Sequence, residues 1–215
     1  MLEYLNQKND FKIYSVQDPE FASYGRVIDY LDTKAVTEAA SRIEMPKEGT
    51  VYKASEQTFE ELSIARDIAD KCFGQMPTQV GHCYGYSSFL NGTEWHLSSE
   101  INIATTPLVL LLGHVWELEN GKIDSSCFKA FYLPRGTAIE CFATTLHFCP
   151  CQVEDSGFSL VVALPLGTNT DLDKKGDDAL LFRKNKWIVS HEKNDSLIAR
   201  GVVPGICGEN IRINY

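Results

Sequence analysis

The sequence predicts a mainly β fold, an antiparallel barrel or sandwich with helices on its N-terminal side. Three observations predict it: helical periodicity is confined to the first third of the chain, short apolar or alternating runs follow from about Val80, and turn residues separate those runs at short intervals. Short strands at such spacing favour one antiparallel barrel or sandwich over a fold of alternating strands and helices.

Two segments of the first third have helical character. A helix is expected over residues 36–43, capped by Asp32 or Thr33. A second helix is expected after Thr58, which stands with Glu61 at capping-box spacing, because apolar residues then recur at helical intervals until a glycine ends them.

The strand-rich remainder is expected to form one barrel. Turn pairs of the Asn-Gly and Ser-Gly type separate the expected strands, which are residues 100–104, 108–116, 130–133, 144–151 and 159–164. We therefore expect residues 1–79 to form a helical and stranded extension that packs on the barrel. Residues 80–215 should form the barrel with a C-terminal segment, and the two parts should make a single structural unit.

Composition excludes several classes of function. The net charge of −9 and the lack of a basic run argue against nucleic-acid binding, and the longest apolar run is too short to cross a membrane. The polar, acidic start does not resemble a signal peptide. Without one, the seven cysteines are expected to be reduced thiols, as in a cytoplasmic protein.

The most informative motif is E-x-H-x3-E, formed by Glu94, His96 and Glu100. Glu94 and His96 are two residues apart, so on a strand their side chains leave the same face, and a short turn could bring Glu100 beside them. Two carboxylates and an imidazole suit one divalent metal such as Zn, Mn, Fe or Ni. An edge strand with ordinary solvated polar residues is the alternative interpretation.

A second polar stretch follows an aromatic strand and a Pro-x-Gly turn at residues 134–136. Such a turn can return a ligand to a pocket that another hairpin has begun. His147 lies in a polar–apolar alternation on the next strand and is the preferred partner of residues 94–100 in a metal site. Glu140 is the competitor, either as a ligand or as an acid–base group beside the metal.

These two stretches together resemble the two motifs of the cupin superfamily, and the whole chain is similar to an uncharacterised cupin-like family. The resemblance implies a cupin-like double-stranded β-helix with one divalent metal inside the barrel. His96 and Glu100 match the His and Glu of the first motif, while Glu94 stands where that motif begins with His. Ile139 occupies the usual His position of the second motif, which leaves His147 or Glu140 as the fourth ligand.

Two classes of function follow from a metal site of this kind. The first is an isomerase, epimerase or lyase that acts on a small sugar or sugar acid, with Glu140, or an uncoordinated Glu94, moving the proton. A similar Glu-x-His order in a β-barrel family of bacterial sugar-catabolism proteins agrees with a carbohydrate substrate. The second class is a non-catalytic sugar- or ligand-binding barrel, and an Fe(II) oxygenase is a third possibility. A homodimer is the expected assembly.

The remaining histidines and the Cys149-x-Cys151 pair are interpreted as structural. His82 is expected to make a structural hydrogen bond, and His114 and His191 to be structural or exposed. Two cysteines without a second close pair are expected to be buried thiols rather than zinc ligands.

Overall fold

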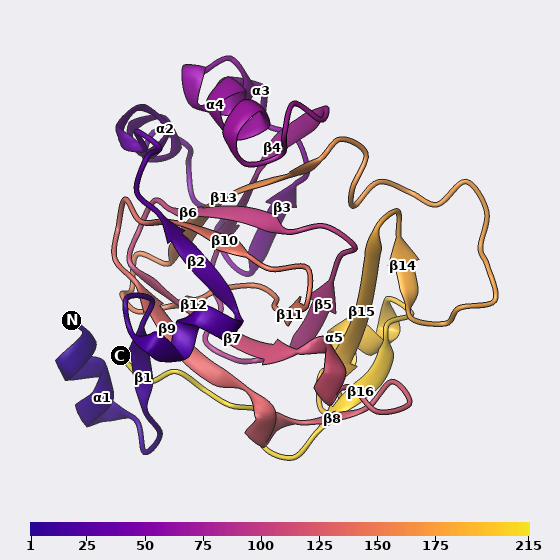
Figure 1. Cartoon of the computed structure of the whole chain (residues 1–215). Helices are drawn as coiled ribbons and strands as arrows, with labels where there is room; N and C mark the ends of the chain where they lie inside the picture. The colour runs from indigo at the N-terminus through magenta and orange to yellow at the C-terminus, as the bar shows by residue number, and fades with distance from the viewer.

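The computed structural model describes residues 1–215. It contains three β-sheets of six, five and five strands together with short helices. Two sheets face each other, helices cover the outside of one of them, and the third sheet lies beside the pair (Figure 1).

The first sheet has six antiparallel strands in the order β2–β10–β6–β13–β4–β3. Their bounds are β2 (Gly25–Ile28), β10 (Ala138–Cys141), β6 (Glu100–Ala104), β13 (Phe158–Pro165), β4 (Thr78–Gly85) and β3 (Thr50–Lys53). The second sheet is centred on β7, which pairs with β9 on one side and with β11 and β12 on the other, while β1 adds to β9 in parallel. Its strands are β1 (Ile13–Ser15), β9 (Lys129–Leu133), β7 (Leu108–His114), β11 (Thr145–Leu146) and β12 (Cys151–Gln152).

The chain winds back and forth between these two sheets. Strand β6 is flanked by β10 and β13 in the first sheet, and β7 is flanked by β9 and β12 in the second, so successive strands cross from one sheet to the other in the same order. This is the double-sheet jelly roll that cupins use. The expected mainly β, cupin-like fold with N-terminal helices is therefore confirmed.

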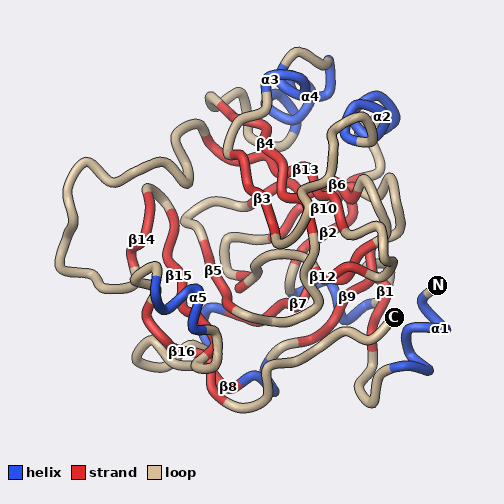
Figure 2. Tube along the Cα trace, turned by 180° about the vertical axis from the view of Figure 1, so that it is seen from behind, coloured by secondary structure: helices blue, strands red, loops and turns tan.

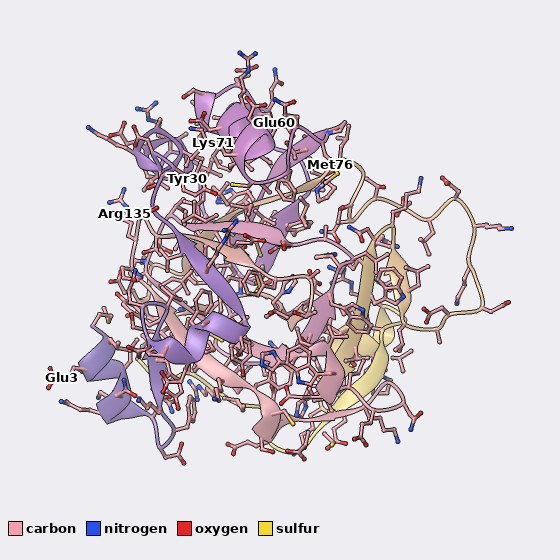
Figure 3. All side chains as sticks on the ribbon, in the orientation of Figure 1. Glu3, Tyr30, Glu60, Lys71, Met76 and Arg135 are labelled. Atoms are coloured by element: carbon pink, nitrogen blue, oxygen red, sulfur yellow. The ribbon has the colours of Figure 1, made fainter.

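The barrel core lies between the inner faces of the two sheets, where side chains fill the space (Figure 3). The second sheet contributes Phe131, whose ring centroid lies 5.4 Å from that of Phe21 and 5.0 Å from that of Tyr24. Complete burial of one such side chain stabilises the fold by about 1.5–3 kcal/mol. Strand β6 shows the alternation that positions the site, because Ile101 and Ile103 point outward while Glu100 shares the inner face with Ala104.

The helices lie outside the barrel. The helices α2 (Lys34–Ala40), α3 (Gln57–Glu60) and α4 (Ser63–Lys71) cover the outer face of the first sheet, and α1 (Leu2–Lys8) lies beside β1 (Figure 1). Three short 3-10 helices complete this set, at Pro19–Ser23, Val115–Glu117 and Ser125–Cys127. No helix of the chain has the length and apolar character needed to cross a membrane.

The third sheet is built mostly from the C-terminal part of the chain. Strands β14 and β16 pair with successive parts of one edge of β15, and β8 pairs with β16. Strand β5 pairs with the other edge of β15 (Figure 2). The bounds are β14 (Leu181–Arg183), β15 (Lys186–His191), β16 (Val203–Cys207), β8 (Ile123–Asp124) and β5 (Gly92–Trp95), with α5 (Asp195–Ala199) between β15 and β16. Because β5 belongs to this sheet and β6 to the first, the turn between them joins the third sheet to the barrel.

The elements differ from the sequence expectations in three places. The helix expected over 36–43 begins and ends earlier, as α2. The second expected helix is two helices, because Leu62 is extended, and the predicted capping box is wrong: Glu56 is the N-cap of α3 and Thr58 lies inside it. The strand expected over 144–151 is two short strands, β11 and β12. The 1–79 segment supplies β1, β2 and β3, which pair with strands of both barrel sheets.

Candidate metal centre

Four side chains from different elements converge at one end of the barrel. Glu94 comes from β5, His96 follows that strand, Glu100 begins β6, and His147 follows β11. Glu100 Oε2 lies 3.4 Å from His96 Nε2 and 3.5 Å from His147 Nε2, and Glu94 Oε1 lies 3.8 Å from His96 Nε2. All four residues are buried. One ligand atom each from Glu94, His96 and His147 lie within 4.8 Å of one another.

The two imidazoles are oriented by main-chain carbonyls. His96 Nδ1 lies 2.6 Å from the carbonyl oxygen of Asn185, and His147 Nδ1 lies 2.9 Å from that of Thr145. Since a carbonyl only accepts, each Nδ1 must donate a hydrogen. In the neutral ring this leaves Nε2 with a free lone pair, and both Nε2 atoms are buried without a hydrogen-bond partner. This is the arrangement that fixes histidine for coordination of a metal through Nε2.

The charged groups of the site shift one another's pKa values, as Glu100 and His147 show. Burial alone would raise the pKa of Glu100, but the charges of His147 and His96 outweigh it and hold the pKa of that carboxyl well below its usual range. Burial alone would lower the pKa of His147, but Glu100, with Cys141, raises it well above the usual value. Glu100 is therefore an anion that attracts a positive charge to the space between the two rings.

Lys186 completes the charged cluster. Its ammonium contacts Glu94 Oε2, whereas Glu94 Oε1 faces His96. The ammonium also lies 5.9 Å from the ring centroid of Tyr52 and 6.0 Å from that of Phe148, and the side chain is only 14% exposed. Strand β15 carries Lys186 directly beside the β5 strand that carries Glu94.

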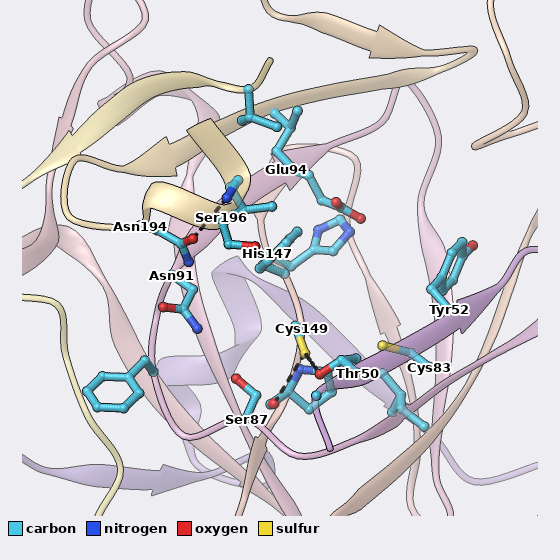
Figure 4. A pocket seen from close by; sticks show the side chains of 18 of the residues that line it. Thr50, Tyr52, Cys83, Ser87, Asn91, Glu94, His147, Cys149, Asn194 and Ser196 are labelled. Carbon is cyan, nitrogen blue, oxygen red and sulfur yellow. Dashed lines mark hydrogen bonds between the residues drawn. The ribbon is translucent and has the colours of Figure 1, made fainter. Parts of the chain in front are cut away.

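The cluster opens into a cavity of about 800 Å³ (Figure 4). Glu94, Glu100 and His147 face this cavity together with Lys186. Its other walls mix aromatic, thiol, hydroxyl and amide groups, contributed by residues such as Tyr52, Phe148, Phe182, Cys83, Cys149, Ser87, Asn91, Asn194 and Ser196. The cavity is large enough for a small polar molecule to reach Glu94, Glu100 and His147, whereas His96 lies behind them.

The structure does not bring Glu140 to this site. Glu140 pairs with Ile101 across the sheet and shares its outward direction, and its Oε2 accepts a hydrogen bond from Arg26 Nε at 2.7 Å. Ile139, at the usual His position of the second motif, points into the apolar core. The predicted set Glu94, His96, Glu100 and His147 is brought together, whereas Glu140 lies on the other face of β10.

The other singled-out residues lie apart from the four. His82 Nε2 lies 2.7 Å from Ser159 Oγ, on the helix-covered face of the first sheet, and burial lowers the pKa of His82 to about 4. His114 stacks between Tyr24 and Trp116. His191 is fully buried, and Lys193 N donates to its Nδ1.

The two cysteines of the C-x-C pair differ in their surroundings. Cys151 is buried in the apolar cluster behind the second sheet, whereas the thiol of Cys149 lines the cavity and lies 3.5 Å from Thr50 Oγ1. All seven cysteines are free thiols.

Sequence reasoning missed two residues that matter here, Lys186 and Asn185. Both lie at the turn into β15, about ninety residues from the E-x-H-x3-E motif, and no local pattern marks them. The Asn-Lys pair following a charged loop indicates a turn and gives no sign of contact with Glu94 or His96.

The donor set fits a divalent cation. Two imidazole nitrogens and two carboxylates are ligands that Zn, Mn, Fe and Ni accept, and the buried, unpaired Nε2 atoms require a partner. The contacts between the opposite ring nitrogens and main-chain carbonyls hold both rings in place.

A family profile described as "Domain of unknown function (DUF4867)" matches residues 13–211 of the chain. A comparison with curated proteins finds no match.

Several solved structures are similar to the chain at low identity. The non-heme alpha-ketoglutarate-dependent epimerase SnoN from nogalamycin biosynthesis has 12% identity and a TM-score of 0.38, over 99% of this chain and 93% of that chain. A mutant oxalate decarboxylase of Bacillus subtilis has 9% identity and a TM-score of 0.29, over 46% of this chain and 26% of that one. A mutant salicylate 1,2-dioxygenase of Pseudoaminobacter salicylatoxidans, in complex with gentisate, has 10% identity and a TM-score of 0.31, over 75% and 39%. The chain spans only about a quarter to two fifths of the length of the last two, and at these TM-scores no residue role transfers to it.

Proposed function

The chain belongs to the family described as domain of unknown function DUF4867, and we propose that it is a divalent-metal-dependent enzyme acting on a small sugar or sugar acid. One observation carries the proposal. His96 and His147 present buried, unpaired Nε2 atoms to the same space, where Glu100 and Glu94 also point, at the inner end of a cavity.

The proposed ligands are His96 and His147 through Nε2, with Glu100 and Glu94 through carboxylate oxygens. Glu100 Oε2 lies at similar distances from both ring nitrogens, 3.4 and 3.5 Å, so one cation between them could contact all three groups. Mixed imidazole and carboxylate ligands favour Zn, Mn, Fe or Ni over Ca or Mg, which prefer oxygen alone.

The proposed reaction is an isomerisation, epimerisation or elimination that begins with removal of a proton next to a carbonyl. A bound divalent ion supplies the polarisation of that carbonyl. When His96, His147 and Glu100 alone hold the metal, the uncoordinated Glu94 is the carboxylate suited to take the proton, because it faces the cavity beside Lys186. The contact between the Lys186 ammonium and Glu94 Oε2 fixes the position of the Glu94 carboxylate.

An Fe(II) oxygenase is the second candidate. Glu94, His96 and His147 make a two-histidine, one-carboxylate set, and this composition suits non-heme Fe(II) with open positions for oxygen. The two candidates share the metal site and differ in whether oxygen is consumed.

The experiment begins with metal analysis of protein purified without a metal-affinity step. The protein is then loaded separately with Zn, Mn, Fe(II) or Ni and incubated in D2O with aldoses, ketoses and uronates, followed by proton NMR. Deuterium entering a carbon next to a carbonyl supports the proposed reaction. Oxygen uptake with the Fe(II) form supports the oxygenase, and bound metal without either reaction supports a binding barrel. Absence of stoichiometric metal under every loading condition would overturn both enzyme proposals.

A further inference from the structure

Lys186 has more hydrogen-bonding capacity than its known contact uses. An ammonium carries three donors, and Glu94 is its one carboxylate contact. The side chain is 14% exposed, and the two neighbouring rings of Tyr52 and Phe148 restrict where the ammonium can lie. A largely buried ammonium with unused donors is costly unless a ligand or water completes it.

The charged residues that line the cavity give a second reason to expect a ligand at Lys186. Four charged residues line it: Glu94 and Glu100, which belong to the proposed ligand set, and Lys186 and Arg200, which do not. The four formal charges cancel, so a divalent cation leaves the loaded cavity with two positive charges. This local surplus contrasts with the net charge of −9 for the whole chain. It favours an anionic ligand over a neutral one.

We propose that the substrate carries a carboxylate, which Lys186 binds directly beside the metal ligands, and that Arg200 strengthens the attraction from the cavity wall. The inference rests on the proposed function, since the charge surplus requires the bound cation. It narrows the substrate class to hydroxy acids of the uronate or aldonate type. The amide and hydroxyl groups of Asn91, Asn194, Ser87 and Ser196 suit the remaining hydroxyl groups of such a molecule.

Lys186 suits a carboxylate better than a hydroxyl at this place. A neutral hydroxyl would satisfy a donor but would leave the desolvated ammonium without a second opposite charge. A carboxylate next to the reacting carbon would also place that carbon near Glu94, because Glu94 and Lys186 are in contact. The Lys186 ammonium would then orient the substrate, and the Glu94 carboxylate would face the carbon that loses its proton.

Calorimetry measures binding in this cavity. Trp95 and Trp187 lie on the face of the paired strands opposite to Glu94 and Lys186, so tryptophan fluorescence does not report on the cavity directly. Titrations of the metal-loaded protein are therefore followed by calorimetry.

The ligands are a panel of hexuronates and aldonates, each beside the neutral sugar of the same configuration and its phosphate ester. At least one carboxylate should bind about 10-fold or more tighter than its neutral counterpart, and removal of the metal should weaken that preference. If no carboxylate in the panel is preferred, the inference is overturned. Tighter binding of the phosphate esters would overturn the carboxylate assignment.

Substitutions test the role of Lys186 itself. Lys186→Met should weaken carboxylate binding about 10- to 100-fold and neutral-sugar binding by much less, whereas Lys186→Arg should retain part of the preference. Arg200→Met should have a smaller effect. The matched control is Lys184→Met, since Lys184 is half-exposed and pairs with Asp173 outside the cavity. Equal loss for both sugar classes would overturn the inference.

Metal content separates this inference from the function on which it rests. It is measured in the same samples, by elemental analysis of the wild-type protein and of each variant. Wild-type protein that holds no metal refutes the proposed function. Metal-loaded protein that shows no preference for a carboxylate refutes only the role of Lys186.

Discussion

Glu94 and His147 face each other across a short antiparallel bridge. The backbone N–H of Glu94 donates to the carbonyl of His147 at 2.7 Å, and the N–H of His147 donates to the carbonyl of Glu94 at 3.0 Å. Two residues opposite each other in an antiparallel pair point to the same side, so this one bridge places a carboxylate and an imidazole together although 53 residues separate them in the sequence.

Replacement of either histidine should abolish tight metal binding. His147→Ala or His96→Ala removes one of two imidazole nitrogens, and the affinity for the metal should fall by at least about 100-fold, more than the usual cost of losing an outer contact. Equilibrium dialysis with zinc measures it. His114→Ala is the matched control, because that ring stacks on Tyr24 and Trp116 away from the cavity. Stoichiometric metal in both histidine variants would refute the ligand assignment.

Substitution of Glu100 should reduce metal affinity, whereas substitution of Glu140 should not. Glu100→Gln removes the anion between the two rings and should reduce metal affinity by about 10-fold or more. Glu140→Gln breaks only the ion pair with Arg26, which is 59% exposed, and should change the free energy of unfolding by less than about 1 kcal/mol. Metal content and urea unfolding of both variants test this. A loss of metal in Glu140→Gln would contradict the placement of Glu140 outside the site.

Asn185 should control the orientation of His96. Its carbonyl accepts from His96 Nδ1, its backbone has a φ of 55°, and its side chain accepts from Leu97 N at 2.9 Å. Alanine is disfavoured at a positive φ and has no side-chain oxygen to accept from Leu97 N. Metal affinity of Asn185→Ala should therefore fall about 10- to 100-fold.

A second Asn185 variant isolates the backbone contribution. Asn185→Gly restores the conformation without the side chain and should recover part of the affinity. Equal affinity of the alanine variant and the wild-type protein would show that the carbonyl is positioned without Asn185.

His82 should make the fold sensitive to acid. Burial lowers the pKa of His82 to about 4, below the ordinary value near 6.5 in the unfolded chain. The unfolded state therefore binds more protons between these two values, so the stabilising contribution is complete above about pH 6.5 and is lost as the pH falls toward 4. Between pH 7 and pH 5, His82 should account for about 2 kcal/mol of lost stability.

The measurement is urea unfolding of the metal-free protein at both pH values. His82→Gln keeps a polar group near Ser159 but cannot titrate. Its loss of unfolding free energy between pH 7 and pH 5 should therefore be about 2 kcal/mol smaller than that of the wild-type protein. An identical loss in the variant and the wild-type protein would exclude His82 as the source.

The sequence determined the fold class and most of the candidate metal set. Strict alternation in residues 100–104 placed Glu100 on the opposite face from Ile101, and the spacing of Glu94 and His96 placed both on one side of a strand. Such patterns are local, because a strand repeats every two residues and its buried face selects apolar side chains.

Only the tertiary structure decided which distant residues contact Glu94, His96 and Glu100. A one-residue difference along β10 sends Glu140 outward and Cys141 inward, and the sequence by itself did not fix that register. The contact of Lys186 with Glu94 and that of Asn185 with His96 depend on β15 pairing with β5, a pairing of segments about ninety residues apart. Local periodicity carries no information about which strand becomes a neighbour, because that choice is made by the packing of the whole core.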